Sequence, residues 1–349
     1  MKFYHLFVIA AIVSLLCVAC GQPTSEPAAG FRTLEVAPPG RDGSISVSLW
    51  YPPGEGGSRN VVGGNKVFTG VPVAQDAAIA DGEFPIVLLA HGGLRAAPQM
   101  SAWVAAYLAL HGFIVATPHP PQLGPDEAQA ALAEVWLRPA DLSATLQAIG
   151  ADAELNAHLQ KDRVGVLGFL LGGASALALA GAEIDPASYA EMCDGDVAIG
   201  MDCFWFAQKG VDLHEVDITS LTQPSYNPKI KVAIAIDPEL STIFTPASLS
   251  GIVIPITIIN LGAPDTILPG LNAASLEGLI PGATYATVPD ATQFSAFSEC
   301  TAKGALILQE EGDDAALCTD GGERSRAEIH GQLAEMIERI LGQTLTAPQ

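Results

Sequence analysis

The chain has 349 residues, of which 49% are hydrophobic and 15% charged, and this length and composition predict one large globular domain with a buried sheet. Its formal net charge is −22, and so acidic a surface repels phosphate backbones, which excludes nucleic acid as an expected partner.

The N-terminal residues are typical of an export segment. Met1-Lys2 is followed by an apolar stretch to Val18 and by small residues before a cleavage point, which predicts a signal peptide over residues 1–19. Residues 17–20, Cys-Val-Ala-Cys, are similar to a bacterial lipobox with lipid on Cys20, although Cys17 stands where leucine is usual. Plain cleavage after residue 19 is the alternative, and both predict export, as a membrane-anchored lipoprotein, a periplasmic protein or a secreted one. No other apolar run is long enough to span a bilayer, so a membrane is an expected partner only through that lipid.

The main domain is expected over residues 31–342, between a polar, Pro-rich tether (20–30) and a tail (343–349). Residues 44–51 alternate polar and apolar side chains, which predicts an antiparallel edge strand, and a Gly-rich loop follows to about residue 82. Mainly apolar runs predict further strands, namely residues 85–90, 113–117, 164–167, 231–236, 254–260 and 284–288. Helices are predicted over 99–111, over 139–150 with Pro139 in the first turn, over 174–180 and over 324–341. Such alternation indicates a mostly parallel sheet flanked by helices.

Two segments that carry cysteines interrupt this alternation. Residues 183–229 predict a cap inserted over the carboxyl end of the sheet, and residues 296–320 form a second excursion. An even number of cysteines in an exported protein favours disulfides, and of the three connectivities we favour the local pairs Cys193–Cys203 and Cys300–Cys318. Zinc binding is the alternative, but no Cys-x-x-Cys or histidine cluster supports it, so we expect no metal and no other cofactor.

The most informative motif lies where the third predicted buried strand meets its helix. Residues 168–173 read Gly-Phe-Leu-Leu-Gly-Gly, between an apolar strand and a helix of small residues. This is the frame of a nucleophile elbow, G-x-S-x-G, which holds a serine on a sharp turn at the top of a sheet. Leu170 stands in the place of that serine. The frame for ester hydrolysis is therefore present without its reacting atom.

The motifs in chain order resemble a known family. They are His91-Gly92-Gly93, Pro118-His119-Pro120, Arg138-Pro139-Ala140-Asp141, the elbow, and the strand that ends in Asp237-Pro238. In order and spacing they resemble bacterial exported proteins called predicted dienelactone hydrolases, which are similar to platelet-activating-factor acetylhydrolases. The resemblance covers roughly residues 31–342 and implies an α/β-hydrolase fold with serine-type hydrolysis of carboxylic esters.

The resemblance implies a catalytic acid and a catalytic base. Asp265, just past a buried strand, is the acid candidate that we favour slightly, and Asp237, where the acetylhydrolases place theirs, is the alternative. Either aspartate is otherwise a simple turn or helix cap. The family has a histidine in the loop after the last strand, and Gln293 stands in that position here. Leucine is no nucleophile and glutamine is no base near neutral pH, so two of the three triad members are missing.

The remaining parts of the site are expected to persist. The resemblance implies one oxyanion amide at Leu171 and another near Leu94, in a turn that begins His91-Gly92-Gly93. Residues 169–171, Phe169, Leu170 and Leu171, are expected to give the pocket an apolar floor. A relocated triad that uses Ser175, His91 or His119 is disfavoured because such constellations need sub-ångström placement. His330 is expected to be a helix-surface residue.

These observations predict a catalytically impaired pseudo-hydrolase that retains an apolar ligand pocket. Once one member of a triad is lost, loss of another costs little more, which explains two substitutions in one site. The expected partner is a small ester or an apolar ligand, and no protein partner is identified. The alternative is an active carboxylic-ester hydrolase that acts on small or lipid-like esters through a non-standard site.

Overall fold

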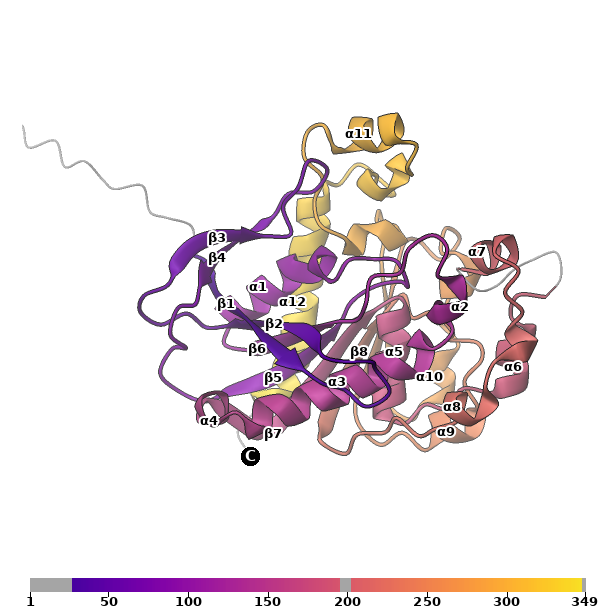
Figure 1. Cartoon of the computed structure of the whole chain (residues 1–349), viewed down its shortest axis with the longest axis horizontal. Helices are drawn as coiled ribbons and strands as arrows, with labels where there is room; N and C mark the ends of the chain where they lie inside the picture. The colour runs from indigo at the N-terminus through magenta and orange to yellow at the C-terminus, as the bar shows by residue number, and fades with distance from the viewer. Residues whose placement is uncertain (1–26, 195–201, 347–349) are drawn as a thin grey trace, which may run out of the picture.

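The computed structural model describes residues 27–194 and 202–346, and within them ten strands form one sheet in the order β10-β9-β8-β7-β5-β6-β2-β1-β4-β3 (Figure 1). The strands from β10 to β6 in this order all run parallel, as predicted. They are β5 (Phe84–Ala90), β6 (Ile114–His119), β7 (Leu159–Phe169), β8 (Ile230–Ile236), β9 (Ile256–Leu261) and β10 (Thr284–Val288).

The other end of the sheet was not fully predictable. It holds β1 (Ala29–Val36), β2 (Ile45–Tyr51), β3 (Ser58–Val62) and β4 (Val71–Gln75). The prediction that β2 lies at an edge was wrong, because β2 pairs antiparallel with β6 on one side and with β1 on the other. β1 begins inside the expected tether, and just after it Phe31 packs edge-on against Trp50 with ring centroids 4.7 Å apart. The short and largely exposed β3 lies in the expected Gly-rich loop and lacks a clear alternating pattern.

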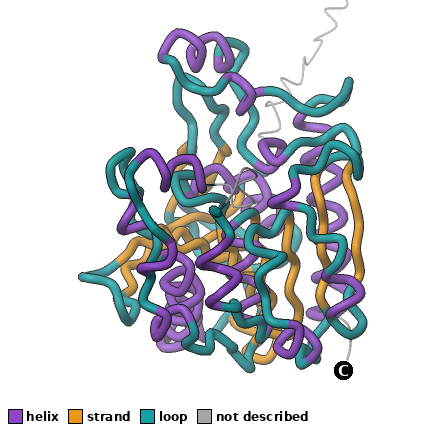
Figure 2. Tube along the Cα trace, turned by 90° about the vertical axis from the view of Figure 1, so that its right-hand side faces the viewer, coloured by secondary structure: helices purple, strands orange, loops and turns teal. Residues whose placement is uncertain are grey.

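Helices cover both faces of the sheet (Figure 2). α3 (Glu134–Ala151) and α5 (Leu171–Ala180) pack on one face, and α1 (Ala102–Leu110) and α12 (Arg326–Leu345) pack on the other. The shorter elements are η1 (Pro98–Ser101), α2 (Ala128–Ala131), α4 (Ala153–Asn156), α6 (Pro186–Glu191), α7 (Cys203–Gln208), η2 (Leu213–Glu215), α8 (Ile218–Leu221), α9 (Pro246–Ser250), η3 (Pro269–Leu271), α10 (Leu276–Leu279), η4 (Gln293–Ala296), α11 (Gly304–Glu311) and η5 (Ala315–Cys318).

Helix α3 begins before Pro139, which lies inside the helix and not in its first turn as predicted. A proline inside a helix removes one backbone hydrogen bond. Ion pairs stabilise the turn before it: Arg41 Nη1 lies 2.7 Å from Glu134 Oε1, and Arg138 Nε lies 3.2 Å from Glu134 Oε2. Arg41 also binds Asp141, about two turns after Glu134, so a buried ionic cluster holds the helix across the proline.

The two disulfides are the pairs favoured from the sequence, Cys193–Cys203 and Cys300–Cys318. The first joins α7 to the segment after α6 in the expected cap, and Trp205 Nε1 ties the cap to Pro125 O at 2.8 Å. The second closes the excursion that carries α11, which projects at the top of Figure 1. The predicted signal peptide, Cys20 and residues 195–201 of the cap lie outside the described residues. In the part that is described, no helix combines the length and apolarity needed to cross a bilayer.

Candidate functional site

The turn between β7 and α5 has the geometry of a nucleophile elbow. Leu170 has φ 51° and ψ −122°, a backbone conformation that costs a non-glycine residue about 1–3 kcal/mol. Neighbouring backbone holds it there, because Leu170 N–H donates to Ile236 O at 2.9 Å and Leu170 O accepts from Gly173 N–H at 2.8 Å. The strained turn therefore persists although its residue is leucine.

The elbow glycines are required by the close approach of backbone atoms. A Cβ on Gly168 would lie 1.9 Å from Gly172 O, and a Cβ on Gly172 would lie 2.2 Å from Ala90 O. Neither oxygen can move without displacing the helix or the strand that carries it. The packing of α5 against β5 and β7 thus fixes both glycines independently of any chemistry.

Side chains fill the space beside the elbow. Leu170 is 6% exposed and packs in an apolar cluster with Leu271 and Phe297. A Cβ on Gly92 would lie 3.2 Å from Phe297 Cε1 and 3.5 Å from Leu170 Cδ1, so both side chains sit against the turn after β5. Leu170, Leu271 and Phe297 therefore form an apolar plug beside the elbow. The sequence had instead predicted that Leu170 forms part of the floor of a pocket.

Phe169 also differs from its expected place. Successive side chains of a strand point to opposite faces of the sheet. Phe169, at the end of β7, points to the face that α12 covers and lies in the core there. Its ring centroid is 6.4 Å from that of Trp103, and it does not line the cavity described below. Phe169 supports the sheet beneath the elbow.

Of the two acid candidates, the geometry favours Asp237. Asp237 directly follows β8 with φ 44°, is 2% exposed, and accepts hydrogen bonds at Oδ1 from Asn260 Nδ2 (2.7 Å) and Leu261 N–H (2.9 Å). Its Oδ2 is buried without a hydrogen-bond partner among the described residues. Burial raises the pKa of this carboxyl to about 7. Asp265 is exposed on the loop after β9, which fits a simple turn residue.

Gln293, in the base position, begins η4 after β10. The residues that follow it bring the turn to the elbow, since Phe294 and Phe297 both belong to the apolar cluster of Leu170. Thr292 N–H donates to Ser295 Oγ at 2.9 Å in a capping box. The turn that begins at Gln293, the expected base position, is thus fixed by the capping box and contacts the apolar cluster of Leu170 through its phenylalanines.

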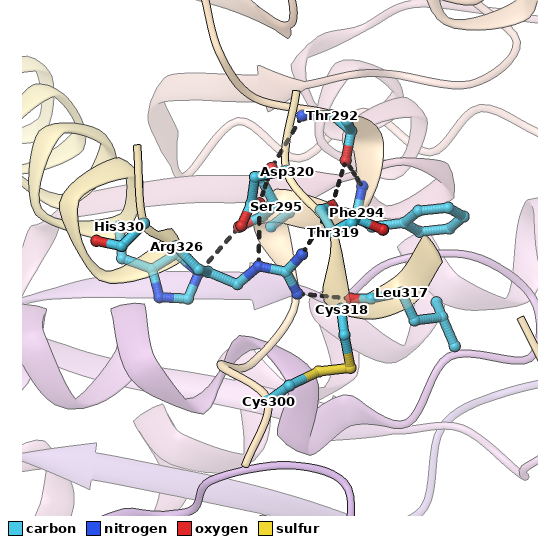
Figure 3. A network of polar contacts seen from close by, with 12 residues as sticks. Thr292, Phe294, Ser295, Cys300, Leu317, Cys318, Thr319, Asp320, Arg326 and His330 are labelled. Atoms are coloured by element: carbon cyan, nitrogen blue, oxygen red, sulfur yellow. Dashed lines mark hydrogen bonds and ion pairs between the residues drawn. A yellow bond between two sulfur atoms is a disulfide. The ribbon is translucent and has the colours of Figure 1, made fainter. Parts of the chain in front are cut away.

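A polar network holds this turn to the second excursion and to α12 (Figure 3). Ser295 Oγ donates to Asp320, and Arg326 binds Asp320 Oδ1 through Nε (3.1 Å) and Leu317 O through Nη1 (2.7 Å). The network lies beside the Cys300–Cys318 disulfide. Because Ser295 at its centre is fully buried, we interpret this network as structural, holding the turn in place.

The expectation that His330 lies on the helix surface was wrong. Its ring stacks on Trp103 with centroids 3.8 Å apart, and its Nε2 lies 2.9 Å from Ser295 O. Burial lowers its pKa to about 4, so the ring is neutral near pH 7. The helical periodicity of residues 324–341 did not reveal this because the partner side chain comes from α1.

Of the other serine and histidine candidates, Ser175 and His119 have partners away from the elbow, and both ring nitrogens of His91 are buried without a hydrogen-bond partner among the described residues. Ser175 Oγ donates to Leu171 O, one turn back in α5, at 3.0 Å. His119 Nε2 lies 2.9 Å from Ser48 Oγ, between β6 and β2. His91 is buried, and burial lowers its pKa well below the ordinary value of 6.5. Over residues 27–194 and 202–346 the structure brings no serine and histidine together at the elbow.

The expected oxyanion turn is held by Arg138, a role that the sequence did not reveal. Its Nη1 donates to Gly92 O at 2.6 Å and its Nη2 to Gly93 O at 3.2 Å. The guanidinium is itself fixed by the ionic cluster with Glu134 and Arg41. Arg138 thus fixes the backbone of the turn in which an oxyanion amide is expected.

A small cavity of about 30 Å³ lies on the cap side of the elbow, with room for one or two waters. Its lining combines Leu94 and Leu171, the two expected oxyanion positions, with apolar cap residues and the carboxyls of Asp202 and Glu239. Burial is the main cause that raises the pKa of both, that of Glu239 to about 8. Sequence reasoning missed both acids, although Glu239 stands two positions after the strand-end Asp237. No three His, Cys, Asp or Glu side chains of the described segments group as metal ligands would.

Stability is expected to fall between pH 6.5 and 8. The raised pKa values of Asp237 and Glu239, about 7 and about 8, mean that their stabilising contribution is complete below their ordinary values of 3.8 and 4.5 and is lost as the pH rises through 7 and 8. His119 and His330, with pKa values lowered to about 4, destabilise only below pH 6.5. We expect the free energy of unfolding to fall by up to about 1.4 kcal/mol per pH unit for each carboxyl.

Urea unfolding at pH 6.5 and 8 measures this slope. Asp237→Asn should flatten it, and Asp265→Asn, at an exposed position, should leave it unchanged. A stability that rises over this pH range would contradict the assignment.

No model of a known protein family matches the sequence, and no curated protein matches it either. Solved structures do resemble it. A ferulic acid esterase from Streptomyces cinnamoneus superposes with a TM-score of 0.58 at 15% identity, covering 94% of both chains. A dienelactone hydrolase from Anabaena variabilis gives a TM-score of 0.50 at 12% identity over 91% of this chain and 100% of its own. Together with the sheet order and the elbow, these similarities show that the chain has the α/β-hydrolase fold, a mostly parallel sheet flanked by helices with two disulfide-bearing loops.

Proposed function

We propose that this chain is an exported pseudo-hydrolase, an α/β-hydrolase-fold protein that no longer performs serine-type ester hydrolysis. The observation that carries the proposal is the residue at the elbow. Leu170 has the strained backbone of a nucleophile, φ 51°, but its side chain is apolar, buried and packed against Phe297. A nucleophile and a general base act as a unit, and Gln293 replaces the second of them.

The proposal includes a family and a place in the cell. The order of motifs supports kinship with exported dienelactone hydrolases of bacteria, and the structural neighbours with hydrolase and esterase names are compatible with it. The apolar N-terminal stretch supports a signal peptide. Lipidation at Cys20 would then anchor the protein at the periplasmic side of a membrane. Two disulfides fit an oxidising compartment of this kind.

The ligand proposed for the retained site is small. The cavity beside Leu94 and Leu171 is mainly apolar but holds two carboxyls, so it suits a compact acyl or ester-like group with a polar end. The sequence predicted an apolar ligand, and the cavity restricts this prediction to a small ligand with a polar end. A large aromatic ester would require Leu170 and Phe297 to move.

An active ester hydrolase with a non-standard site is the second candidate. The observation in its favour is the pair Asp202 and Glu239, a half-buried and a buried carboxyl with raised pKa values that line one cavity. Perturbed acids in a cleft are candidates for general acid and base roles. Such an enzyme would turn over esters without a serine.

The native mature domain is expected to show no turnover of short-chain p-nitrophenyl esters and no labelling by a fluorophosphonate, with a serine esterase assayed in parallel as the positive control. Labelling that disappears in Ser175→Ala would contradict the loss of serine chemistry. Turnover that resists the fluorophosphonate and disappears in Glu239→Gln would establish the second candidate instead.

A further inference from the structure

The side chain of Glu239 lies at the elbow, on the loop after β8. Glu239 N–H donates to Leu170 O at 3.2 Å, which straps this residue onto the elbow turn. The side chain is 7% exposed and points into the cavity that Leu94 and Leu171 also line. A Cβ on Gly93 would lie 3.6 Å from Glu239 Oε1, so the carboxyl is in van der Waals reach of the turn after β5.

The neighbours of this carboxyl are the groups that should bind an oxyanion. The Leu171 amide faces it and lowers its pKa, which opposes the larger effect of burial. Leu171 is the backbone amide among the causes that shift the pKa of this carboxyl. A buried carboxyl with so few donors is costly unless it is protonated or fills a site made for an anion.

Charged side chains around Glu239 come from three other elements. Asp202, at the N-terminus of α7, raises the pKa of Glu239, and Arg138, on α3, lowers it. Arg95, in the turn after β5, lowers the pKa of Asp202. With its pKa raised to about 8, the Glu239 carboxyl is mainly protonated near neutral pH and carries no charge beside Asp202.

We propose that the Glu239 carboxyl occupies the oxyanion hole of the elbow as a built-in ligand, and that the hole takes a small carboxylic acid or carboxylate once this side chain is removed. The inference rests on the proposed function, because an enzyme in turnover would need this hole for its substrate. It adds that three side chains close the site, Leu170 and Phe297 at the nucleophile position and Glu239 at the oxyanion position.

Acetate tests the proposal because Glu239→Ala removes the atoms that acetate would replace. In Glu239→Ala, acetate is expected to raise the melting temperature saturably and to bind at least about tenfold more tightly than to the native protein, since the vacated amide regains its partner. Binding should be stronger at pH 5.5 than at pH 8 because the site beside Asp202 takes up a proton. Glu239→Gln, which still fills the hole, and Glu183→Ala, at an exposed glutamate, should behave like the native protein. Sodium chloride at equal ionic strength controls for screening.

A second measurement uses the native chain and does not depend on the folding of Glu239→Ala. With ¹⁵N-leucine labelling, the Leu171 amide resonance should shift as the pH rises through about 8, and this titration should be absent in Glu239→Gln. Equal acetate binding by native protein and Glu239→Ala, or a Leu171 amide that does not titrate, would overturn the proposal. Neither readout involves turnover, so an active enzyme would refute the proposed function separately.

Discussion

Gly168→Ala is expected to destabilise the protein by more than about 4 kcal/mol or to prevent folding, because it forces a Cβ into backbone. The added atom would lie 1.9 Å from Gly172 O and 2.3 Å from Gly172 C, in the first turn of α5. No side-chain rotation relieves such a contact. The helix would have to move off β7, and β7 lies in the middle of the sheet. Urea unfolding with the disulfides intact measures the loss.

Gly331→Ala is the matched control for this change. Gly331 lies inside α12, is exposed, and has nothing within 4 Å of an added Cβ. An alanine there should stabilise the helix by about 1 kcal/mol. If the two variants had similar stabilities, the elbow would be looser than its packing indicates.

The parallel part of the fold could be predicted from the sequence because its signals are local. Strands buried on both faces are apolar throughout, as in Val87 to Leu89, and the elbow glycines and the cysteine pairs are close neighbours in the chain. β1, β3 and β4 could not be predicted in the same way. β3 and β4 pair with each other and β1 pairs with β4, but the tether and the Gly-rich loop carry no periodic apolar pattern that would mark these strands.

The candidate site was predictable at the level of motifs but not of contacts. Asp237 and Asp265 both follow buried strands, and only their burial separates them, since Asp237 is 2% exposed and Asp265 lies at the surface. The burial of His330 depends on Trp103 from another helix. Glu239 belongs to no sequence motif. Its proposed role rests on the short distance between its carboxyl and the turn after β5.

Backbone strain gives a further reason to regard this region as a former active site. Leu170, Asp237 and Leu240 are non-glycine residues with φ of 51°, 44° and 61°, and all three follow the neighbouring strands β7 and β8. Strain of this kind clusters at functional sites. At Leu170 the strained backbone is held by the close packing of the elbow glycines and by backbone hydrogen bonds, which explains how the elbow keeps its shape with a leucine in it.

Efficient ester hydrolysis should appear when all three proposed departures from a working site are reversed. Leu170→Ser/Gln293→His supplies a hydroxyl at the elbow and an imidazole on the turn after β10, and the unpartnered Oδ2 of Asp237 is the acceptor that such an imidazole needs. Leu170→Ser also removes part of the apolar plug, at a cost in stability of about 3 kcal/mol. Adding Glu239→Ala frees the Leu171 amide, and an oxyanion donor contributes about 100-fold or more to the rate. We therefore expect p-nitrophenyl acetate hydrolysis by the triple variant to exceed that of the double variant about 100-fold.

The pattern of activities among the variants separates the two proposals. Adding Asp237→Asn to the triple variant should abolish its activity, whereas adding Asp265→Asn should not, because only Asp237 is buried with a free oxygen. Full activity in the double variant would mean that the oxyanion hole is already open and that Glu239 does not fill it. Hydrolysis by the native chain at the rate of the triple variant would mean that the site never lost its chemistry. Under the proposal, three side chains on an intact frame account for the missing catalysis, and each of them can be tested by its own reversal.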